Sequence, residues 1–364
     1  MSEDIILIIV VGTALAFDFT NGFHDTANVV ATSISTRALP PRLAVTLAAI
    51  LNFAGAFLSL EVAATVAKDV VDAGVITPTV VFAGLIGAIA WNLATWWFGL
   101  PSSSSHALIG GVVGSAFAAA GADAVFGDGI LGKVLIPAIV APIVAFVIGV
   151  IAINFAYGIA GRERPGPVNR GFRLGQVVSG GMLALAHGTN DAQKTMGIIT
   201  LALIANGSLS ENADVPFWVV VSAAAAIALG TYMGGWRIIR TMGTRIIKMD
   251  PAQGFSAQGA GAAVILASSH YGFPLSTTQV ISGGVMGSGA GKRISAVRWG
   301  VAGNIVVAWL LTLPAAAGIG AATYGLTTLF GSDAAGVVVV ALLAIAGAVW
   351  IFLRRARGVS PVAA

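Results

Sequence analysis

Long apolar stretches separated by short polar loops make up most of this 364-residue chain. A helix needs about 20 apolar residues to cross the hydrocarbon core of a bilayer. On this measure the pattern predicts plain membrane spans at 42–67, 134–160, 215–235, 300–326 and 334–353. Two further stretches, 5–36 and 174–205, are long enough to cross but carry polar side chains at mid-length.

Two other segments have apolar arms that meet at a polar centre containing a proline. Residues 79–122 centre on GLPSSSSHA at 99–107, and residues 257–291 centre on GFPLSTTQV at 272–280. Because proline tends to end a helix, we expect each segment to be a re-entrant hairpin that enters and leaves the membrane on one side. The predicted fold is an all-α integral membrane protein.

Composition and charge agree with this class, since 57% of the residues are hydrophobic and 9% are charged. Soluble domains carry about 25% charged residues. With seven crossings and two hairpins, every basic residue except Lys68, Lys133 and Lys194 falls on one side of the membrane. The positive-inside rule makes that side cytoplasmic, which predicts a multi-pass protein of the cell (plasma) membrane with its N-terminus outside and its C-terminus inside. We interpret the arginine clusters as topology signals and expect no nucleic-acid partner.

The chain also repeats itself weakly. Gly-Phe-His-Asp at 22–25 aligns with Gly-Thr-Asn-Asp at 188–191, and residues 99–115 align with residues 272–288. Each unit holds an odd number of crossings, so the second must be inverted relative to the first, as in secondary transporters with broken helices. The predicted division is a first repeat at 1–160, a cytoplasmic loop at 161–173, a second repeat at 174–326, and an extra C-terminal helix with a basic tail at 327–364.

Charged residues in the middle of the polar spans suggest a functional site. On insertion scales of roughly 2.5–3.5 kcal/mol each, Asp18, Asp25, Asp191 and Lys194 together cost on the order of 10 kcal/mol before pairing. Helical spacing places Lys194 on the same face as Asp191. The alternative for Asp191 and Lys194 is an ion pair that only stabilises the helix. For Asp18, a packing role and a supporting role at the site are both open.

Amide and carboxylate oxygens of the polar spans are the ligands that a small hard cation prefers, and a carboxylate can also hold a proton. The predicted coupling-ion residues, which are also the candidate Na⁺ ligands, are Asn21, Asp25, Asn190 and Asp191.

Runs of hydroxyl residues follow the two hairpin prolines. They are Ser102, Ser103, Ser104 and Ser105 after Pro101, and Ser276, Thr277 and Thr278 after Pro274. Both runs occupy N-cap positions, and a helix N-terminus offers free N–H groups and partial positive charge. Two such tips entering from opposite sides predict an anion site at mid-membrane. The alternative is that the hydroxyls only cap their helices.

NGFHDTANVVATSI at 21–34 and HGTNDAQKTMGIIT at 187–200 resemble the two signature segments of the inorganic phosphate transporter (PiT) family, bacterial type. The resemblance extends over about residues 5–326. It implies import of phosphate by symport with protons or Na⁺, or as a metal–phosphate complex, and no enzymatic activity. It further implies a phosphate site formed by Asp25, Asn28, Ser103, Ser104, Ser105, Asp191, Lys194, Ser276, Thr277 and Thr278.

Lys194 departs from the family pattern, because many members have asparagine there. A fixed ammonium would replace one bound cation or bind phosphate directly, which shifts the expected coupling ion toward protons. A symporter of sulfate or another oxyanion, a channel with two inverted half-helices, and an intramembrane lipid-pyrophosphate phosphatase are the alternatives.

Expected partners are phosphate, the coupling cation and the lipid bilayer. No cofactor is expected apart from the coupling ion and a divalent metal carried with phosphate, and the absence of cysteine excludes a thiolate metal site. The oligomeric state is left open, with a homodimer among the alternatives.

Overall fold

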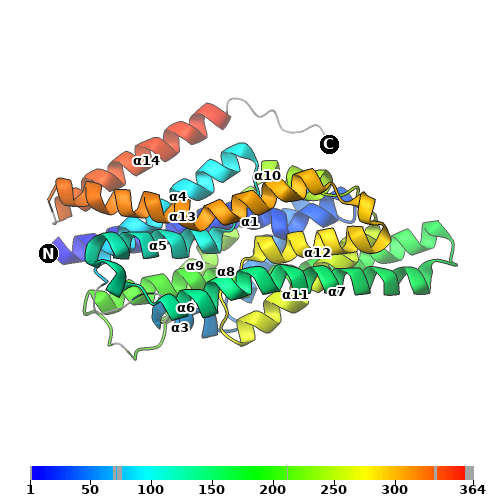
Figure 1. Cartoon of the computed structure of the whole chain (residues 1–364), viewed down its shortest axis with the longest axis horizontal. Coiled ribbons are helices and arrows are strands. Elements are labelled where there is room, and N and C mark those ends of the chain that lie inside the picture. Colours follow the sequence, from blue (N-terminus) through cyan, green and yellow to red (C-terminus); the bar gives the residue numbers. More distant parts are fainter. Residues whose placement is uncertain (1, 69–70, 72–75, 211, 332–333, 357–364) are drawn as a thin grey trace.

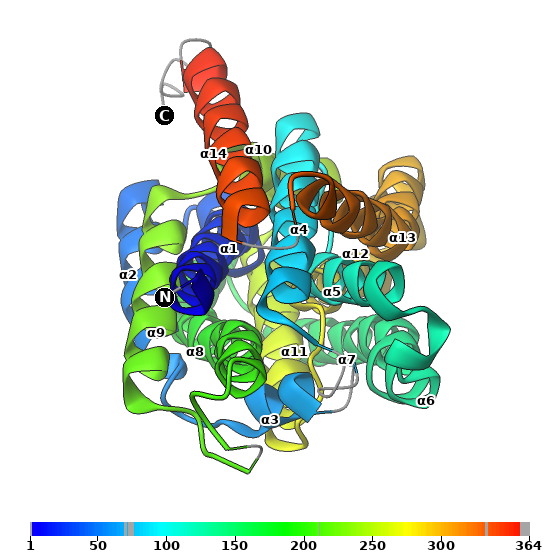
Figure 2. The same ribbon diagram turned by 90° about the vertical axis from the view of Figure 1, so that its left-hand side faces the viewer.

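The computed structural model describes the chain except residues 1, 69–70, 72–75, 211, 332–333 and 357–364. Most helices run along the longest axis of the molecule (Figure 1) and are seen end-on in Figure 2. The helices are α1 (Ser2–Ser35), α2 (Pro41–Gly55), α3 (Glu61–Lys68), α4 (Pro78–Phe98), α5 (Ser104–Ala120), α6 (Gly127–Ile130), α7 (Ile136–Ala160), α8 (Pro165–Ala205), α9 (Phe217–Met233), α10 (Trp236–Arg240), α11 (Pro251–His270), α12 (Thr277–Lys292), α13 (Trp299–Leu329) and α14 (Ala334–Ala356).

The described helices confirm an all-α membrane protein. Four are long and apolar enough to cross a bilayer, namely Asp4–Ser35, Pro78–Phe98, Gly127–Ala160 and Trp299–Leu329. A fifth candidate is the pair Phe217–Met233 and Trp236–Arg245, which is bent by 60°. The extra C-terminal helix predicted at 334–353 is present as α14, while the basic tail at 357–364 lies outside the described residues.

Helix breaks occur at other places than the sequence predicted. The polar spans are continuous helices, because α1 and α8 run through their polar centres without interruption. The span predicted at 42–67 is broken instead, between α2 and α3. The span predicted at 215–235 is the continuous helix α9, and a second break follows at its end. At the second break Gly234 adopts a φ of 70°, a left-handed conformation that glycine adopts readily.

The loop predicted at 161–173 was also wrong in length, because α8 begins at Pro165 and takes in the remaining residues of that segment. Proline suits the first turn of a helix, where its missing N–H group has no partner to lose.

Two helical hairpins are present where the sequence predicted them. The helices α4 and α5 form the first, and α11 and α12 form the second. Figure 1 shows α5 and α12 running from near the middle of the molecule toward opposite ends. Gly99 and Gly272 adopt φ values of 66° and 71° at matching points of the two turns.

The helices form two groups (Figure 2): α1, α2, α8 and α9 on one side, and α5, α7, α12 and α13 on the other. Contacts between helices come in matching pairs. Helix α1 packs on α9 as α8 packs on α2, and the first hairpin packs on α13 as the second packs on α7. A Cβ atom added at Gly22 would lie 2.2 Å from the carbonyl oxygen of Ile227, and one at the matching Gly188 would lie 2.1 Å from that of Asn52. Glycine therefore permits both close approaches, while the inverted relation of the halves stays a prediction.

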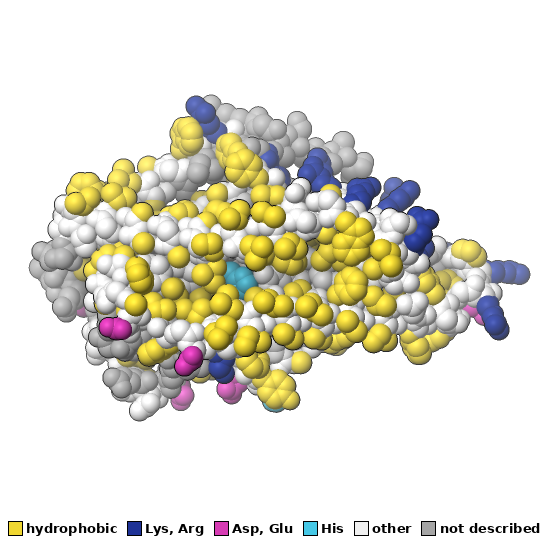
Figure 3. Space-filling view, in the orientation of Figure 1, with side chains coloured by type: hydrophobic (Ala, Val, Ile, Leu, Met, Phe, Trp, Pro, Cys, Tyr) yellow, Lys and Arg dark blue, Asp and Glu magenta, His cyan; other side chains and the backbone are white. Residues whose placement is uncertain are grey.

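Apolar and charged side chains are sorted along the long axis. Figure 3 shows apolar side chains over the middle of the molecule, with Lys and Arg gathered toward one end and Asp and Glu toward the other. Large apolar side chains point outward, such as Ile143 at 57% and Phe155 at 70% exposure on α7. Exposure on this scale marks a surface that faces lipid. The separation of charges agrees with the prediction, and which end is cytoplasmic stays a prediction.

Candidate functional site

The two hairpin tips meet in the interior. The Ser105 hydroxyl donates to the backbone carbonyl of Leu275 at 3.0 Å, and the Gln279 amide nitrogen lies 3.5 Å from Nδ1 of His106. His106 and Gln279 occupy matching positions of the internal repeat. The tips predicted from the two hydroxyl runs therefore lie side by side, as an anion site between them requires.

The two signature carboxylates lie together beneath these tips. One ligand atom each from Asp25, His187 and Asp191 lies within 4.8 Å of the others, and all three side chains are buried. His187 Nε2 is 3.0 Å from Asp191 Oδ2. Asp25 lies on α1, whereas His187 and Asp191 lie on α8, so the polar centres of the two repeats meet at one place.

The second tip binds both carboxylates through its hydroxyls. The Thr277 hydroxyl lies 3.1 Å from Asp191 Oδ2 and 3.5 Å from Asp25 Oδ2, and the Thr278 hydroxyl lies 3.4 Å from Asp25 Oδ1. The Asn28 amide donates to Thr278 Oγ1 at 2.9 Å. Both predicted elements of the site, the hydroxyl runs and the buried acids, are therefore in contact.

Lys194 joins α8 to both hairpins. Its ammonium is paired with Asp191 and donates to the Ser105 hydroxyl at 2.7 Å and to the Leu275 carbonyl at 2.8 Å. The side chain is 1% exposed. Asn28 holds the position of the first repeat that matches Lys194. Its amide donates to the Thr278 hydroxyl, and Thr278 is the residue of the second hairpin that matches Ser105. Each signature helix therefore contacts the hairpin of the opposite repeat.

His24 is a site residue whose role the sequence left open. Its Nδ1 lies 2.6 Å from Asp25 Oδ1, and its Nε2 lies 3.1 Å from the Thr95 hydroxyl. The Ser102 hydroxyl donates to Thr95 at 2.8 Å. The imidazole thus orients Asp25 against the first hairpin. Neither His187 nor Thr95 was among the predicted site residues, and the placement of all four histidines in or beside the polar segments was the signal that could have identified His187.

The remaining predicted residues differ in what they contact. Ser103 and Ser276 are N-caps, since they accept from the backbone N–H groups of His106 and Gln279 at 3.1 and 3.3 Å. For these two the capping alternative holds. The Ser104 hydroxyl, 1% exposed, has no hydrogen-bond partner among the described residues.

The two predicted amide ligands point to different surroundings. Asn190 donates to the Ser269 hydroxyl at 3.0 Å and to the Phe273 carbonyl at 3.2 Å, which directs its amide nitrogen toward the second hairpin. Asn21 lies next to Asp18. The structure therefore brings Asp25 and Asp191 together, whereas the amides Asn21 and Asn190 contact other groups.

The cluster combines anion donors with an excess of negative charge. Two helix N-termini and several hydroxyls point at it, yet the charges of Asp25, Asp191 and Lys194 sum to −1 when the histidines are neutral. An anion placed here would raise the negative charge further in a low-dielectric interior. The arrangement therefore suits an anion that binds together with a cation.

Comparisons with known proteins identify the family of the chain. The phosphate transporter family matches residues 21–165 and 157–320 of the chain. A Mycobacterium leprae (strain TN) protein named "Probable low-affinity inorganic phosphate transporter" is 54% identical over 353 residues, covering 97% of this chain and 85% of that protein. A Bacillus subtilis (strain 168) protein of the same name is 48% identical over 323 residues, covering 88% and 96%. A solved structure titled "The sodium-dependent phosphate transporter" matches with a TM-score of 0.80 and 25% identity over 89% of this chain and 99% of that one. The chain therefore belongs to the phosphate transporter family.

Proposed function

We propose that this protein imports inorganic phosphate across the cell membrane by symport with a cation. The observation that carries the proposal is the meeting of two hydroxyl-lined helix tips with the buried carboxylates of Asp25 and Asp191. Family membership supports a transporter over the phosphatase alternative, and the relatives' printed names favour phosphate over sulfate.

Phosphate would lie between the tips of α5 and α12. Backbone N–H groups at helix N-termini and the hydroxyls of Ser104, Ser105, Thr277 and Thr278 supply donors there. Every one of these side chains is at least 95% buried, so the site is closed to water from both ends. Release then requires the hairpins to move relative to α1 and α8, which is the motion that an inverted repeat provides in other secondary transporters.

Lys194 would stand in for one coupling cation. Its ammonium has three oxygen neighbours, a carboxylate, a hydroxyl and a backbone carbonyl, which is the ligand type of a small hard cation. The matching residue of the first repeat is the uncharged Asn28. Replacing Lys194 with Asn should therefore raise the number of cations carried with each phosphate by one. The measurement is the reversal potential of phosphate uptake in proteoliposomes, and an unchanged stoichiometry would contradict this role.

The proposed function is tested by uptake of labelled phosphate into proteoliposomes. Inward gradients of Na⁺, of protons and of divalent metals are compared, with sulfate as competitor. We expect saturable, gradient-driven uptake that Asp25→Asn and Asp191→Asn abolish without unfolding the protein. Asp128→Asn, at an exposed carboxylate outside the predicted site, is the matched control and should transport normally.

Flux that rises in proportion to concentration would indicate a channel instead. Uptake that sulfate carries equally well would point to an oxyanion symporter. Normal transport by either site variant would refute a shared binding site.

A further inference from the structure

An apolar groove runs between α4 and α14 and has a volume of about 420 Å³. Helix α14 lies at the edge of the bundle beside α4 (Figures 1 and 2) and outside the predicted internal repeat. None of the lining residues belongs to the candidate phosphate site. They are Ile86, Ile89, Ala90, Leu93, Ala94, Trp97 and Phe98 on α4, and Ala344, Gly347 and Trp350 on α14.

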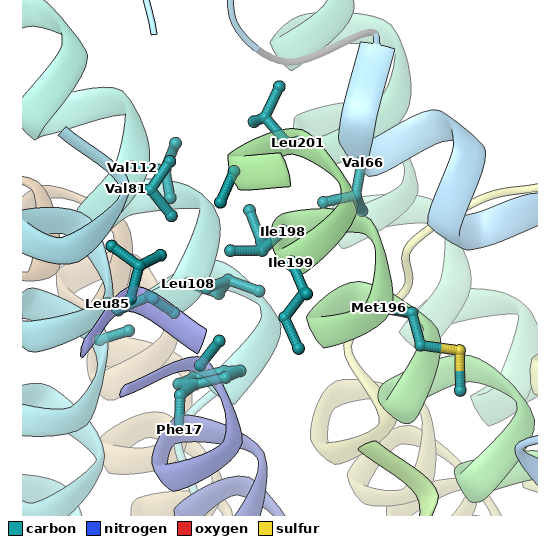
Figure 4. Packing of buried hydrophobic residues seen from close by; sticks show 14 of the residues in the cluster. Phe17, Val66, Val81, Leu85, Leu108, Val112, Met196, Ile198, Ile199 and Leu201 are labelled. Carbon is teal, nitrogen blue, oxygen red and sulfur yellow. The ribbon is translucent and has the colours of Figure 1, made fainter. Parts of the chain in front are cut away.

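The groove exists because α4 is apolar on more than one face. One face points into the core, where Leu85 packs with Phe17 and other buried side chains (Figure 4). The large groove residues of α4, from Ile86 to Trp97, are three or four positions apart, so they form a stripe on another face. The facing residues of α14 include Ala344 and Gly347, which are too small to cover this stripe. Open space surrounds Gly347.

The length of the groove matches one leaflet of a bilayer. Ile86 and Trp97 are eleven residues apart on α4, which corresponds to about 16 Å along a helix. The hydrocarbon core of a bilayer is about 30 Å thick, so this is about half of it. Tryptophan is enriched at the level of the lipid headgroups, and Trp97 and Trp350 both line the groove. The tryptophans therefore mark the headgroup end of a groove that continues toward the bilayer centre.

Positive charge lies at the same end of the groove. The Arg354 guanidinium lies 4.5 Å from the ring centroid of Trp350, and the Arg237 guanidinium donates to the backbone carbonyl of Trp97 at 3.1 Å. Each guanidinium therefore contacts a residue that lines the groove. Arg354 is exposed, and no carboxylate among the described residues forms an ion pair with it. An anion at the headgroup level would compensate this charge.

We propose that this groove binds an anionic phospholipid, with one acyl chain between α4 and α14 and the lipid phosphate at Arg237 and Arg354. The planar guanidinium group matches the oxygens of a phosphate, and basic pockets between membrane helices recognise anionic headgroups in this way. The charge also favours a lipid over a second copy of this chain. A two-fold dimer brings identical patches together, which would place Arg354 beside Arg354 of the other copy. Helix α14 thus completes a lipid site that the repeat alone does not form.

Binding is tested by native mass spectrometry of the purified full-length protein in detergent. Dioleoyl phosphatidylglycerol is compared with dioleoyl phosphatidylcholine, which has the same acyl chains and a headgroup without net charge. We expect the parent to bind phosphatidylglycerol more tightly. Inorganic phosphate should not displace this lipid, because the free anion has no acyl chain to occupy the groove. Displacement by inorganic phosphate at low millimolar concentration would contradict the proposal.

Two variants separate the headgroup from the acyl chain. Arg354→Gln should weaken phosphatidylglycerol binding about fivefold, the loss expected for one basic residue near a membrane surface, and leave phosphatidylcholine binding unchanged. Arg162→Gln, at an exposed arginine in the turn between α7 and α8, is the matched control and should bind like the parent.

Gly347→Leu fills the groove without changing the charge. It should weaken binding of both lipids at least about tenfold, which corresponds to about two CH₂ groups of the chain losing their contact. Gly303→Leu, at an exposed position of α13 with open space around it, is the matched control and should bind both lipids normally. If Gly347→Leu fails to fold, Ala344→Leu fills the groove from the neighbouring lining position of α14.

The proposal is overturned if the parent binds the two lipids equally, or if Arg162→Gln loses as much affinity as Arg354→Gln, since diffuse surface charge would then explain the binding. Unchanged lipid binding by Gly347→Leu would also overturn it. A lipid-free dimer that Gly347→Leu dissociates would place a second copy of the chain in the groove instead. None of these outcomes depends on phosphate uptake, so the lipid site and the proposed function stand or fall separately.

Discussion

Lys194 offers the sharpest test of how the buried charges hold the fold together. Replacing it with methionine keeps an unbranched side chain of similar length and removes the ammonium. The three contacts to Asp191, the Ser105 hydroxyl and the Leu275 carbonyl are lost together. Asp191, 0% exposed, then remains as a buried carboxylate without its cation.

The expected loss of stability follows from these contacts. Hydrogen bonds to charged groups contribute about 1.5–3 kcal/mol each, so the three bonds together amount to roughly 5–9 kcal/mol. Several kcal/mol are regained, because the variant no longer buries an ammonium. The net cost is about 3–5 kcal/mol, in line with other buried pairs that lose one partner. At about 2–4 °C per kcal/mol, the melting temperature should fall by roughly 6–20 °C.

The assay is thermal unfolding in detergent, followed by tryptophan fluorescence. Adding Asp191→Asn to Lys194→Met removes the orphaned charge, so the double variant should melt at a higher temperature than Lys194→Met alone. Lys133→Met is the control, because the described contact of that ammonium is with the Phe273 ring at 5.1 Å. A Lys194→Met protein as stable as the parent would refute the reasoning, as would a double variant that melts no higher.

Two further predictions concern packing and pH. Gly114→Ala should destabilise by about 1–3 kcal/mol, because the new Cβ would lie 2.1 Å from the Ala317 carbonyl oxygen, whereas Gly318→Ala, with open space around it, should melt like the parent. Burial by itself raises the pKa of Asp250. Hydrogen bonds to the carboxylate have the opposite and larger effect, so the pKa is lowered overall; the strongest contribution comes from the Tyr157 hydroxyl, which donates at 2.6 Å. A lowered folded-state pKa stabilises the protein above the unfolded value of about 3.9, and this contribution is lost as the pH falls through the folded value. Tyr157→Phe should therefore lower the melting temperature at pH 7 and approach the parent below about pH 4; an equal difference at every pH would count against the link.

Local chemistry along the chain was enough to predict the spans, the hairpins and the polar segments. Hydropathy over some 20 residues marks a span, and a proline followed by hydroxyls marks the tip of a hairpin. The same reasoning misplaced the helix breaks, because polar residues inside an apolar span suggested interruption. The helices α1 and α8 continue because side chains on other helices give their buried polar groups hydrogen-bond partners. Thr277 is such a partner for Asp191, and Thr95 is one for His24.

The sequence alone determined the membrane class, the repeated signatures and the sorting of charge, and it supplied most of the candidate residues of the site. Only the tertiary structure decided that the tips meet and that Ser103 and Ser276 cap their helices. It also decided that Ser105 contacts Lys194, that Thr277 contacts Asp191, and that Asp18 lies beside Thr195. The physical reason is that sequence spacing sets neighbours within one helix, three or four residues apart. Contacts between helices depend on how whole helices pack, which no local pattern encodes.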